Sequence, residues 1–125
     1  MHAELSYQIA ALGHRDLFMV GDAGMPIPAG VPIIDLAVTG GVPSFVQVMD
    51  AILQETEIEG YTLAEEIKTH NQVLLAYLEE KLAGREENFL PHEDLKKMSK
   101  QVKFAIRTGE FTPYPNVILR AGVAF

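Results

Sequence analysis

His14 and Asp22 are two side chains that could do acid–base chemistry, and they bracket a short apolar run, Leu17 to Gly21. An imidazole titrates near neutral pH and is the commonest general acid or base in enzymes. Asp22 directly follows the run, and open α/β sheets bind ligands outside the carboxyl ends of their strands. A surface His14 in a helix-to-strand turn and a turn-forming Asp22 explain the same residues. Position alone leaves both interpretations open.

A second polar segment, residues 108–116, is dense in hydroxyl, amide and aromatic groups and includes Tyr114 and Asn116. Neutral sugars are recognised by such groups through hydrogen bonds and ring packing. A merely connecting loop with two prolines would need fewer polar groups, so this pattern favours a binding role. His92 follows Pro91 at an expected helix start, where contact with a ligand and capping of the helix are both compatible with its position.

The residue spacing argues against a metal or nucleotide cofactor. His14, Asp16 and Asp22 are close in sequence, but the chain has no helical His-x-x-x-His and no acidic calcium loop. The glycines near Asp22 form neither a phosphate-binding loop nor a dinucleotide fingerprint. The absence of cysteine excludes thiolate nucleophiles and cysteine-rich zinc sites. We therefore expect no cofactor and no metal.

Length and charge narrow the class of protein further. A chain of 125 residues fits one domain, residues 1–125. Ten Lys and Arg against 17 Asp and Glu give a net charge of -7, which argues against a nucleic-acid partner. The first eight residues lack the basic start and apolar stretch of a signal peptide, and no run approaches the ~20 apolar residues of a membrane span. We expect a soluble, cytoplasmic protein.

Apolar periodicity predicts alternating helices and strands. The expected helices cover residues 3–12 with Gly13 as a left-handed cap, about 45–57, about 73–82 with Thr69 or Asn71 near the start and Gly84 past the end, and 92–100. The expected strands cover residues 17–21, 32–36, 61–64, 102–106 and 117–119, and Phe89-Leu90 is a further short apolar piece. Such alternation predicts an α/β domain with helices on both faces of a largely parallel sheet.

Four stretches of the chain stand out together: Leu12-Gly13-His14-Arg15-Asp16, Asp22-Ala23-Gly24-Met25-Pro26-Ile27-Pro28, Ala64-Glu65-Glu66-Ile67-Lys68, and Arg107-Thr108-Gly109-Glu110-Phe111-Thr112-Pro113-Tyr114-Pro115-Asn116. Together they resemble the D-ribose pyranase family. Their order and spacing match over nearly the whole chain. The second and fourth stretches form a specific pair in so small a protein.

The resemblance implies a Rossmann-like three-layer fold and a ring-shaped homo-oligomer, typically a decamer of two pentamers. It implies a cofactor-free isomerase that interconverts the pyranose and furanose forms of D-ribose. The family's proton donor falls on His14, and its sugar-binding positions fall on Asp22, His92, Tyr114 and Asn116. Two alternatives stay open: a fucose-type mutarotase, and a non-catalytic sugar-binding or transport accessory protein.

The two ends of the chain give further expectations. Family members usually begin several residues earlier, so we expect a missing N-terminal piece or a misassigned start. Arg15 also stands where Thr is usual. The apolar C-terminal segment, residues 119–125, would fray unless it docks, and a neighbouring subunit could supply the dock.

The separation of His14 from Asp22 raises a question about the site. An extended strand rises ~3.3 Å per residue, so eight steps would place the two backbones up to about 26 Å apart. Either the turn at residues 14–16 bends the chain back, or His14 and Asp22 meet across a subunit boundary. We favour the shared site.

Overall fold

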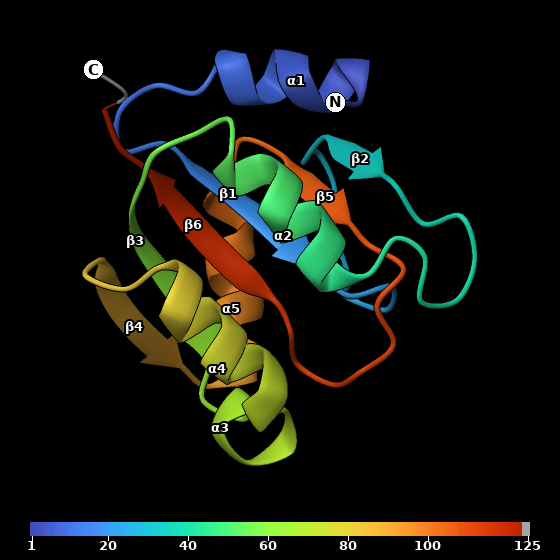
Figure 1. Ribbon diagram of the computed structural model, residues 1–125, viewed down its shortest axis with the longest axis vertical. Coiled ribbons are helices and arrows are strands. Elements are labelled where there is room, and N and C mark those ends of the chain that lie inside the picture. Colours follow the sequence, from blue (N-terminus) through green and yellow to red (C-terminus); the bar gives the residue numbers. More distant parts are fainter. Residues whose placement is uncertain (124–125) are drawn as a thin grey trace.

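A six-stranded sheet forms the centre of the protein in the computed structural model, which describes residues 1–123 (Figure 1). The strands run in the order β2-β5-β1-β6-β3-β4. Their bounds are Leu17–Gly21 (β1), Ile33–Asp35 (β2), Ile58–Ala64 (β3), Glu86–Leu90 (β4), Ala105–Arg107 (β5) and Val117–Ala121 (β6). β6 is antiparallel to β1 and β3, and the other neighbouring pairs are parallel. The sheet is therefore largely parallel, as predicted.

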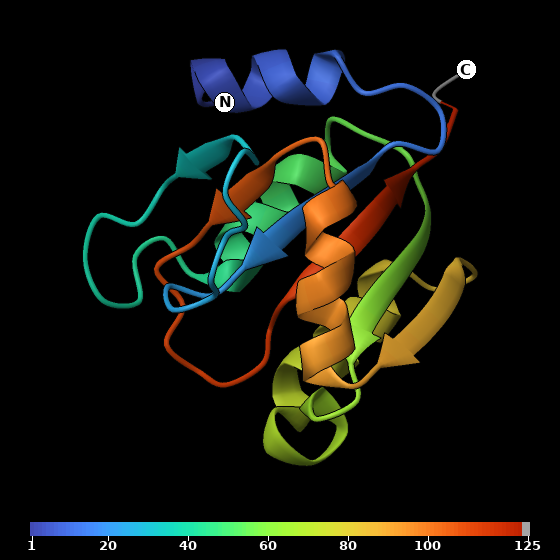
Figure 2. The same cartoon turned by 180° about the vertical axis from the view of Figure 1, so that it is seen from behind.

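Helices cover both faces of this sheet, so the predicted three-layer α/β/α architecture is confirmed. They are α1 (Ala3–Ala10), α2 (Phe45–Leu53), α3 (Ile67–His70), α4 (Gln72–Lys81), α5 (His92–Met98) and the 3-10 helix η1 (Ser99–Gln101). Figure 2 shows α5 on the face opposite to α2 and α4. Within residues 1–123, no helix has the length and apolar character needed to cross a membrane.

Strand β1 shows how the sequence builds two cores. Successive side chains of a strand point to opposite faces. Phe18 and Val20 accordingly pack into the larger core with α1, α2 and α4, whereas Met19 packs into the smaller core with Leu95 of α5. Phe18, Met19 and Val20 are all fully buried. A continuous apolar run is what a strand covered on both faces requires.

The alternation of helix and strand fails between β1 and β2, which are joined by a loop instead of a helix. Met25, Ile27 and Val31 of this loop pack into the smaller core beside Met19. The loop thus covers part of the sheet face that a crossover helix would cover in a regular α/β unit. This arrangement also brings the loop beside the ends of the neighbouring strands.

The predicted helix ends are partly correct. Asn71 caps α4 by accepting a hydrogen bond from Leu74 N, and Gly84 follows the helix with a φ of 83°. Gly13 is not a left-handed cap, because α1 ends at Ala10 and the turn before β1 takes its positive φ, 74°, at Arg15. The apolar C-terminal segment, which we expected to dock, packs in part against its own subunit, since Leu119 and Ala121 are buried in β6. Residues 124–125 of this segment lie outside the described residues.

Candidate active site

Four of the five predicted site residues meet at one edge of the sheet. β1, β3, β4 and β5 end at this edge, and β6 begins there. Asp22, His92, Tyr114 and Asn116 line a pocket of about 240 Å³, together with Gly24, Met25, Pro26 and Pro113. The volume is below the ~300–1,000 Å³ typical of sites for drug-sized ligands, so the pocket suits a small molecule.

Asp22 and Asn116 form the polar floor of the pocket. Asn116 is 1% exposed; its Oδ1 accepts a hydrogen bond from Asp22 N at 2.8 Å, and its Nδ2 donates to Asp22 Oδ2 at 3.2 Å. Asp22 Oδ1 accepts from Gly24 N at 2.8 Å. Asp22 therefore forms the turn that its plainer interpretation predicted and also lines the pocket. Gly21 permits this arrangement, because a Cβ there would lie 2.9 Å from Asn116 Oδ1.

The two loops that supply these residues are hydrogen-bonded to each other. Thr108 donates from its N–H and its Oγ1 to Gly21 O, and Ala23 N donates to Glu110 O at 2.9 Å. Glu110 also accepts from Phe45 N and from Thr112. Burial raises the pKa of Glu110, but these hydrogen bonds outweigh it and hold the pKa below its usual value. The pocket is thus preorganised by the loops themselves.

Tyr114 has a backbone conformation that few non-glycine residues adopt, with φ at 61°. Its ring lies against two imidazoles, 5.1 Å from that of His92 and 5.4 Å from that of His70. Asn71 holds the preceding segment by donating to Thr112 Oγ1 and Pro113 O, each at 2.9 Å. Backbone conformations of this kind persist where surrounding contacts enforce them, and they cluster at ligand sites.

His92 is positioned by the carboxylate of Glu66, which accepts from His92 N at 3.0 Å and 3.2 Å. The side chain of His92 does not cap α5, whose N-cap is Pro91, so the capping interpretation is wrong. Among residues 1–123, the buried His92 Nδ1 has no hydrogen-bond partner. The imidazole is therefore not occupied by the protein's own polar groups.

The pocket offers one carboxylate, one imidazole, one phenol and one amide beside apolar side chains. This mixture can orient a small polyhydroxyl ligand by hydrogen bonds while a carbon face packs against Met25, Pro26 and Tyr114. No cluster of three or more His, Asp or Glu residues suited to a metal ion occurs in the described part of the chain. Binding of a neutral ligand by hydrogen bonding is what this geometry supports.

His14 lies at the opposite edge of the sheet, and the turn at residues 13–16 does not bend it back towards Asp22. Arg15 N donates to Ala121 O, and Ala121 N donates to Asp16 O, which fixes the turn beside the end of β6. His14 Nε2 lies 3.0 Å from Glu59 Oε2, next to the start of β3. Glu66, which holds His92, comes seven residues later, beyond the other end of β3. At ~3.3 Å per residue, the length of β3 therefore separates Glu59 beside His14 from Glu66 beside His92 by about 20 Å.

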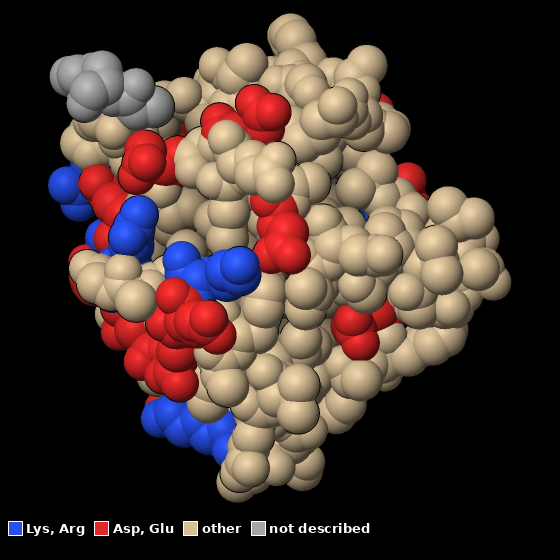
Figure 3. Space-filling view, viewed as in Figure 1, with Lys and Arg blue, Asp and Glu red and all other residues tan. Residues whose placement is uncertain are grey.

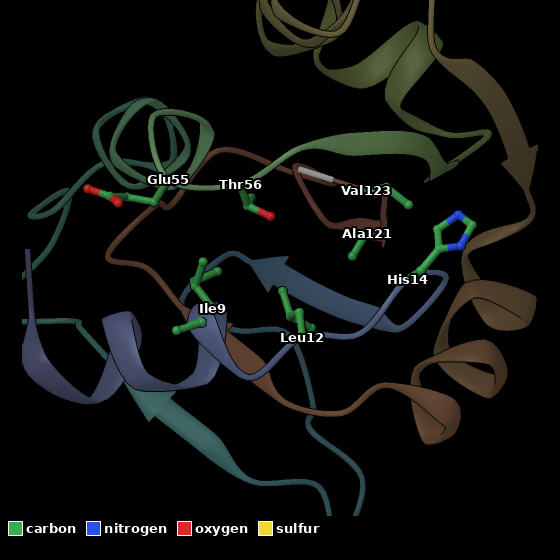
Figure 4. A pocket seen from close by; sticks show the side chains of 9 residues that line it. Ile9, Leu12, His14, Glu55, Thr56, Ala121 and Val123 are labelled. Carbon is green, nitrogen blue, oxygen red and sulfur yellow. The ribbon is translucent and has the colours of Figure 1, made fainter. Parts of the chain in front are cut away.

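His14 lines a second pocket, of about 350 Å³ (Figure 4). His14 stands at one end of it and Glu55 at the other, with Ile9, Leu12 and Thr56 between them. The His14 side chain is 50% exposed. Figure 3 shows charged side chains of both signs gathered along the side of the molecule where β4 lies. The edge that carries His14 is open and charged.

An α/β sheet with a small hydrogen-bonding pocket at the carboxyl ends of its strands defines a class of binding proteins and enzymes for small ligands. The particular family follows from comparison with known proteins. The chain belongs to the RbsD / FucU transport protein family, whose model matches residues 1–124.

Named relatives cover this chain completely. A D-ribose pyranase from Lactiplantibacillus plantarum is 45% identical over 125 residues, which are 100% of this chain and 95% of the relative. A D-ribose pyranase from Geobacillus kaustophilus is 46% identical and is covered to 92% of its length. The solved structure of Bacillus subtilis RbsD complexed with D-ribose matches with a TM-score of 0.97 at 42% identity, over 100% of this chain and 95% of that one.

The fucose-type relatives share the fold at lower similarity. The fucose mutarotase from Streptococcus pneumoniae, solved in complex with L-fucose, matches with a TM-score of 0.81 at 20% identity, over 99% of this chain and 94% of its own. Its likeness shows the common fold alone.

Sequence reasoning missed two glutamates that hold the predicted histidines. Glu66 follows the end of β3, and that position at the carboxyl edge is a signal that could have revealed it. Glu59 had no such signal, because its partner His14 is 45 residues away in sequence.

Proposed function

We propose that this protein is a D-ribose pyranase, an isomerase that interconverts the pyranose and furanose forms of D-ribose. The observation that carries this conclusion is the pocket of Asp22, His92, Tyr114 and Asn116 in a chain that superimposes on a D-ribose complex with a TM-score of 0.97. The named D-ribose pyranases at about 45% identity support the same assignment. The fucose-type relatives, at 20% identity, support it less.

The chemistry needs only proton transfers. Opening the ring requires a proton delivered to the ring oxygen while another leaves the anomeric hydroxyl. The free aldehyde then rotates, and attack by the C4 hydroxyl in place of the C5 hydroxyl closes the furanose. One ring C–O bond breaks and another forms, and the protons balance, so neither a redox step nor a covalent enzyme intermediate is needed. Asp22, His92, Tyr114 and Asn116 hold the sugar hydroxyls, and His14 supplies the proton.

We infer that each complete site is shared between two subunits. His14 and the sugar pocket lie at opposite edges of the sheet, farther apart than one pentose can span. A head-to-tail ring of copies would bring the His14 edge of one subunit to the pocket edge of the next. Exposed apolar side chains at one side of the molecule, Ile33, Val38 and Phe111, offer surface for such contacts. We propose the decamer of two pentamers as the assembly.

The same proposal places the enzyme in the cytoplasm, as a supplier of furanose for ribose phosphorylation. It also holds that the reaction proceeds without metal or cofactor. Treatment with EDTA should accordingly leave exchange unchanged, whereas activity lost in EDTA and restored by a divalent ion would contradict this part of the proposal.

Magnetisation-transfer NMR on D-ribose, L-fucose and D-galactose tests the proposed function directly. We expect micromolar protein to accelerate exchange between the pyranose and furanose lines of ribose. Unchanged exchange of ribose together with accelerated exchange of fucose would assign a fucose-type mutarotase. Ribose binding with no exchange of any of the sugars would assign a binding or transport accessory protein.

A further inference from the structure

Glu59 bridges His14 and Arg120. Its Oε2 lies 3.0 Å from His14 Nε2, and its Oε1 accepts a hydrogen bond from Arg120 Nε at 2.8 Å. Each carboxylate oxygen therefore has its own partner, so the carboxylate cannot rotate without losing one of them. The three side chains come from the turn before β1, from β3 and from β6.

The Arg120 guanidinium is itself held in place. Its Nη2 donates to Glu86 Oε2 of β4 at 2.7 Å, so the guanidinium lies across β3 between two carboxylates. Gly60 is paired with Arg120 in the β3–β6 register, and a Cβ at residue 60 would lie 2.6 Å from Arg120 Nη2. The absence of a side chain at Gly60 leaves the space that the guanidinium occupies. Glu59 is thus oriented by contacts on the side away from His14.

The carboxylate determines which nitrogen of His14 carries a proton. An ionised carboxylate only accepts hydrogen bonds, so Nε2 must be the protonated nitrogen. The hydrogen bond from His14 has the largest effect and lowers the pKa of Glu59; burial opposes it, and the hydrogen bond from Arg120 lowers the pKa further, so the group stays ionised at neutral pH. Nδ1 is then a bare acceptor in neutral imidazole and a donor in imidazolium.

We propose that Glu59 is the positioning residue for His14: it holds Nε2–H and leaves Nδ1 as the nitrogen that exchanges a proton with the sugar. This inference rests on the proposed function, since it assigns His14 as the acid. The carboxylate also stabilises the imidazolium when Nδ1 takes a proton from the sugar. Partners of this kind fix the tautomer and orientation of functional histidines.

The other groups near His14 do not substitute for Glu59. Asp16 is engaged in its own turn, where its Oδ2 accepts from Gly13 N at 2.7 Å. Glu55 lies at the far end of the pocket that His14 lines (Figure 4). Arg120 is a cation and cannot accept a proton from imidazole. Within residues 1–123, Glu59 is the carboxylate in contact with the His14 ring.

The first test needs no substitution. The ¹⁵N shifts of the His14 ring, identified as the signals lost in His14→Gln, report which nitrogen is protonated in the neutral form. We expect the Nε2–H tautomer in the wild-type protein and a mixture of tautomers in Glu59→Gln. A wild-type Nδ1–H tautomer would overturn the inference even if the protein proves to be an active pyranase.

The second test measures activity. Glu59→Gln should lower kcat for ribose exchange by roughly ten- to a hundredfold, the scale found for the hydrogen-bond partners of metal-ligating histidines. KM should stay unchanged, because the sugar-holding residues lie at the other edge. Glu57→Gln is the matched control: it removes the same charge at the same edge, from a residue that pairs with Arg85 at 3.6 Å and not with His14.

The outcomes separate this inference from the proposed function. Wild-type kcat in Glu59→Gln, or an equal loss in Glu57→Gln, contradicts the role of Glu59 while leaving the pyranase assignment intact. Absence of exchange in the wild-type protein contradicts the pyranase assignment, and the ¹⁵N spectra then still decide whether Glu59 fixes the tautomer.

Discussion

The two edges of the sheet carry opposite kinds of site. At the carboxyl edge, Asn116 is buried, and its side-chain oxygen and nitrogen both form hydrogen bonds with Asp22 of the other loop. At the other edge, the His14 side chain is 50% exposed and the contacts are ion pairs at the surface. Under the proposed function, one edge holds the ligand in place and the other presents the exposed imidazole of His14.

On the proposed function, this difference would let one small domain divide the work of a reaction. Preorganised hydrogen-bonding groups must be buried to be held precisely, and their burial costs nothing only when all partners are present. A proton donor must instead be reachable by a substrate that sits elsewhere. With the two at opposite edges, the proposed assembly of the subunits is what would bring them together.

The largest expected effect comes from removing the proposed proton donor, His14. His14→Ala should lower the rate of ribose exchange by roughly a hundredfold or more, the usual scale of a lost general acid. Ribose binding measured by calorimetry should persist, because His14 does not line the sugar pocket of its own chain. Wild-type exchange in a folded, correctly assembled His14→Ala protein would rule out its catalytic role.

Asn116→Ala changes the carboxyl edge and should lower both the affinity for ribose and the free energy of unfolding. The substitution leaves Asp22 N without its acceptor in a partly buried position, which costs on the order of 1–3 kcal/mol. Urea unfolding and calorimetry measure the two effects. The exposed Gln101→Ala serves as control and should change neither. Unaltered ribose affinity in Asn116→Ala would show that this pocket is not the sugar site.

A smaller, pH-dependent effect is expected at Glu110. Because its pKa is lower in the folded state, Glu110 stabilises the fold above its unfolded-state pKa of about 4.3, and this contribution is lost as the pH falls through the folded value. The Tm difference between wild type and Glu110→Gln should thus be largest near pH 7 and shrink in acid. The exposed Glu80→Gln is the control. A Tm difference that stays constant down to acidic pH would contradict this stabilising role of the Glu110 carboxylate.

The fold was predictable from the sequence where burial and periodicity coincide. The run at residues 17–21 is a strand with those bounds, and Asn71 and Gly84 mark the ends of α4. The expected strand at residues 102–106 is displaced to Ala105–Arg107, because Val102 and Phe104 are buried without belonging to a strand. Apolar residues indicate that a segment is buried, but they do not indicate which backbone groups form the hydrogen bonds of a sheet.

Other features depend on contacts between distant segments. α2 ends at Leu53 instead of about residue 57, and the four-residue helix α3 is too short to show a period. The direction of β6 is not encoded in its residues, since a strand buried on both faces reads the same either way. The four pocket residues were predicted from the family resemblance, from the place of Asp22 after a strand and from the polar loop that carries Tyr114 and Asn116. The role of Glu59 could be inferred only from the fold, which brings it to His14.

The measurement that tests the account most directly is complementation between two inactive variants. His14→Ala and Asp22→Ala subunits are mixed under conditions that exchange subunits, and mixed assemblies are confirmed by native mass spectrometry. If each site joins His14 of one subunit to Asp22 of another, some interfaces receive both intact residues, and ribose exchange should recover in part. Confirmed mixed assemblies with no recovery would place the whole site within one chain and contradict the shared site.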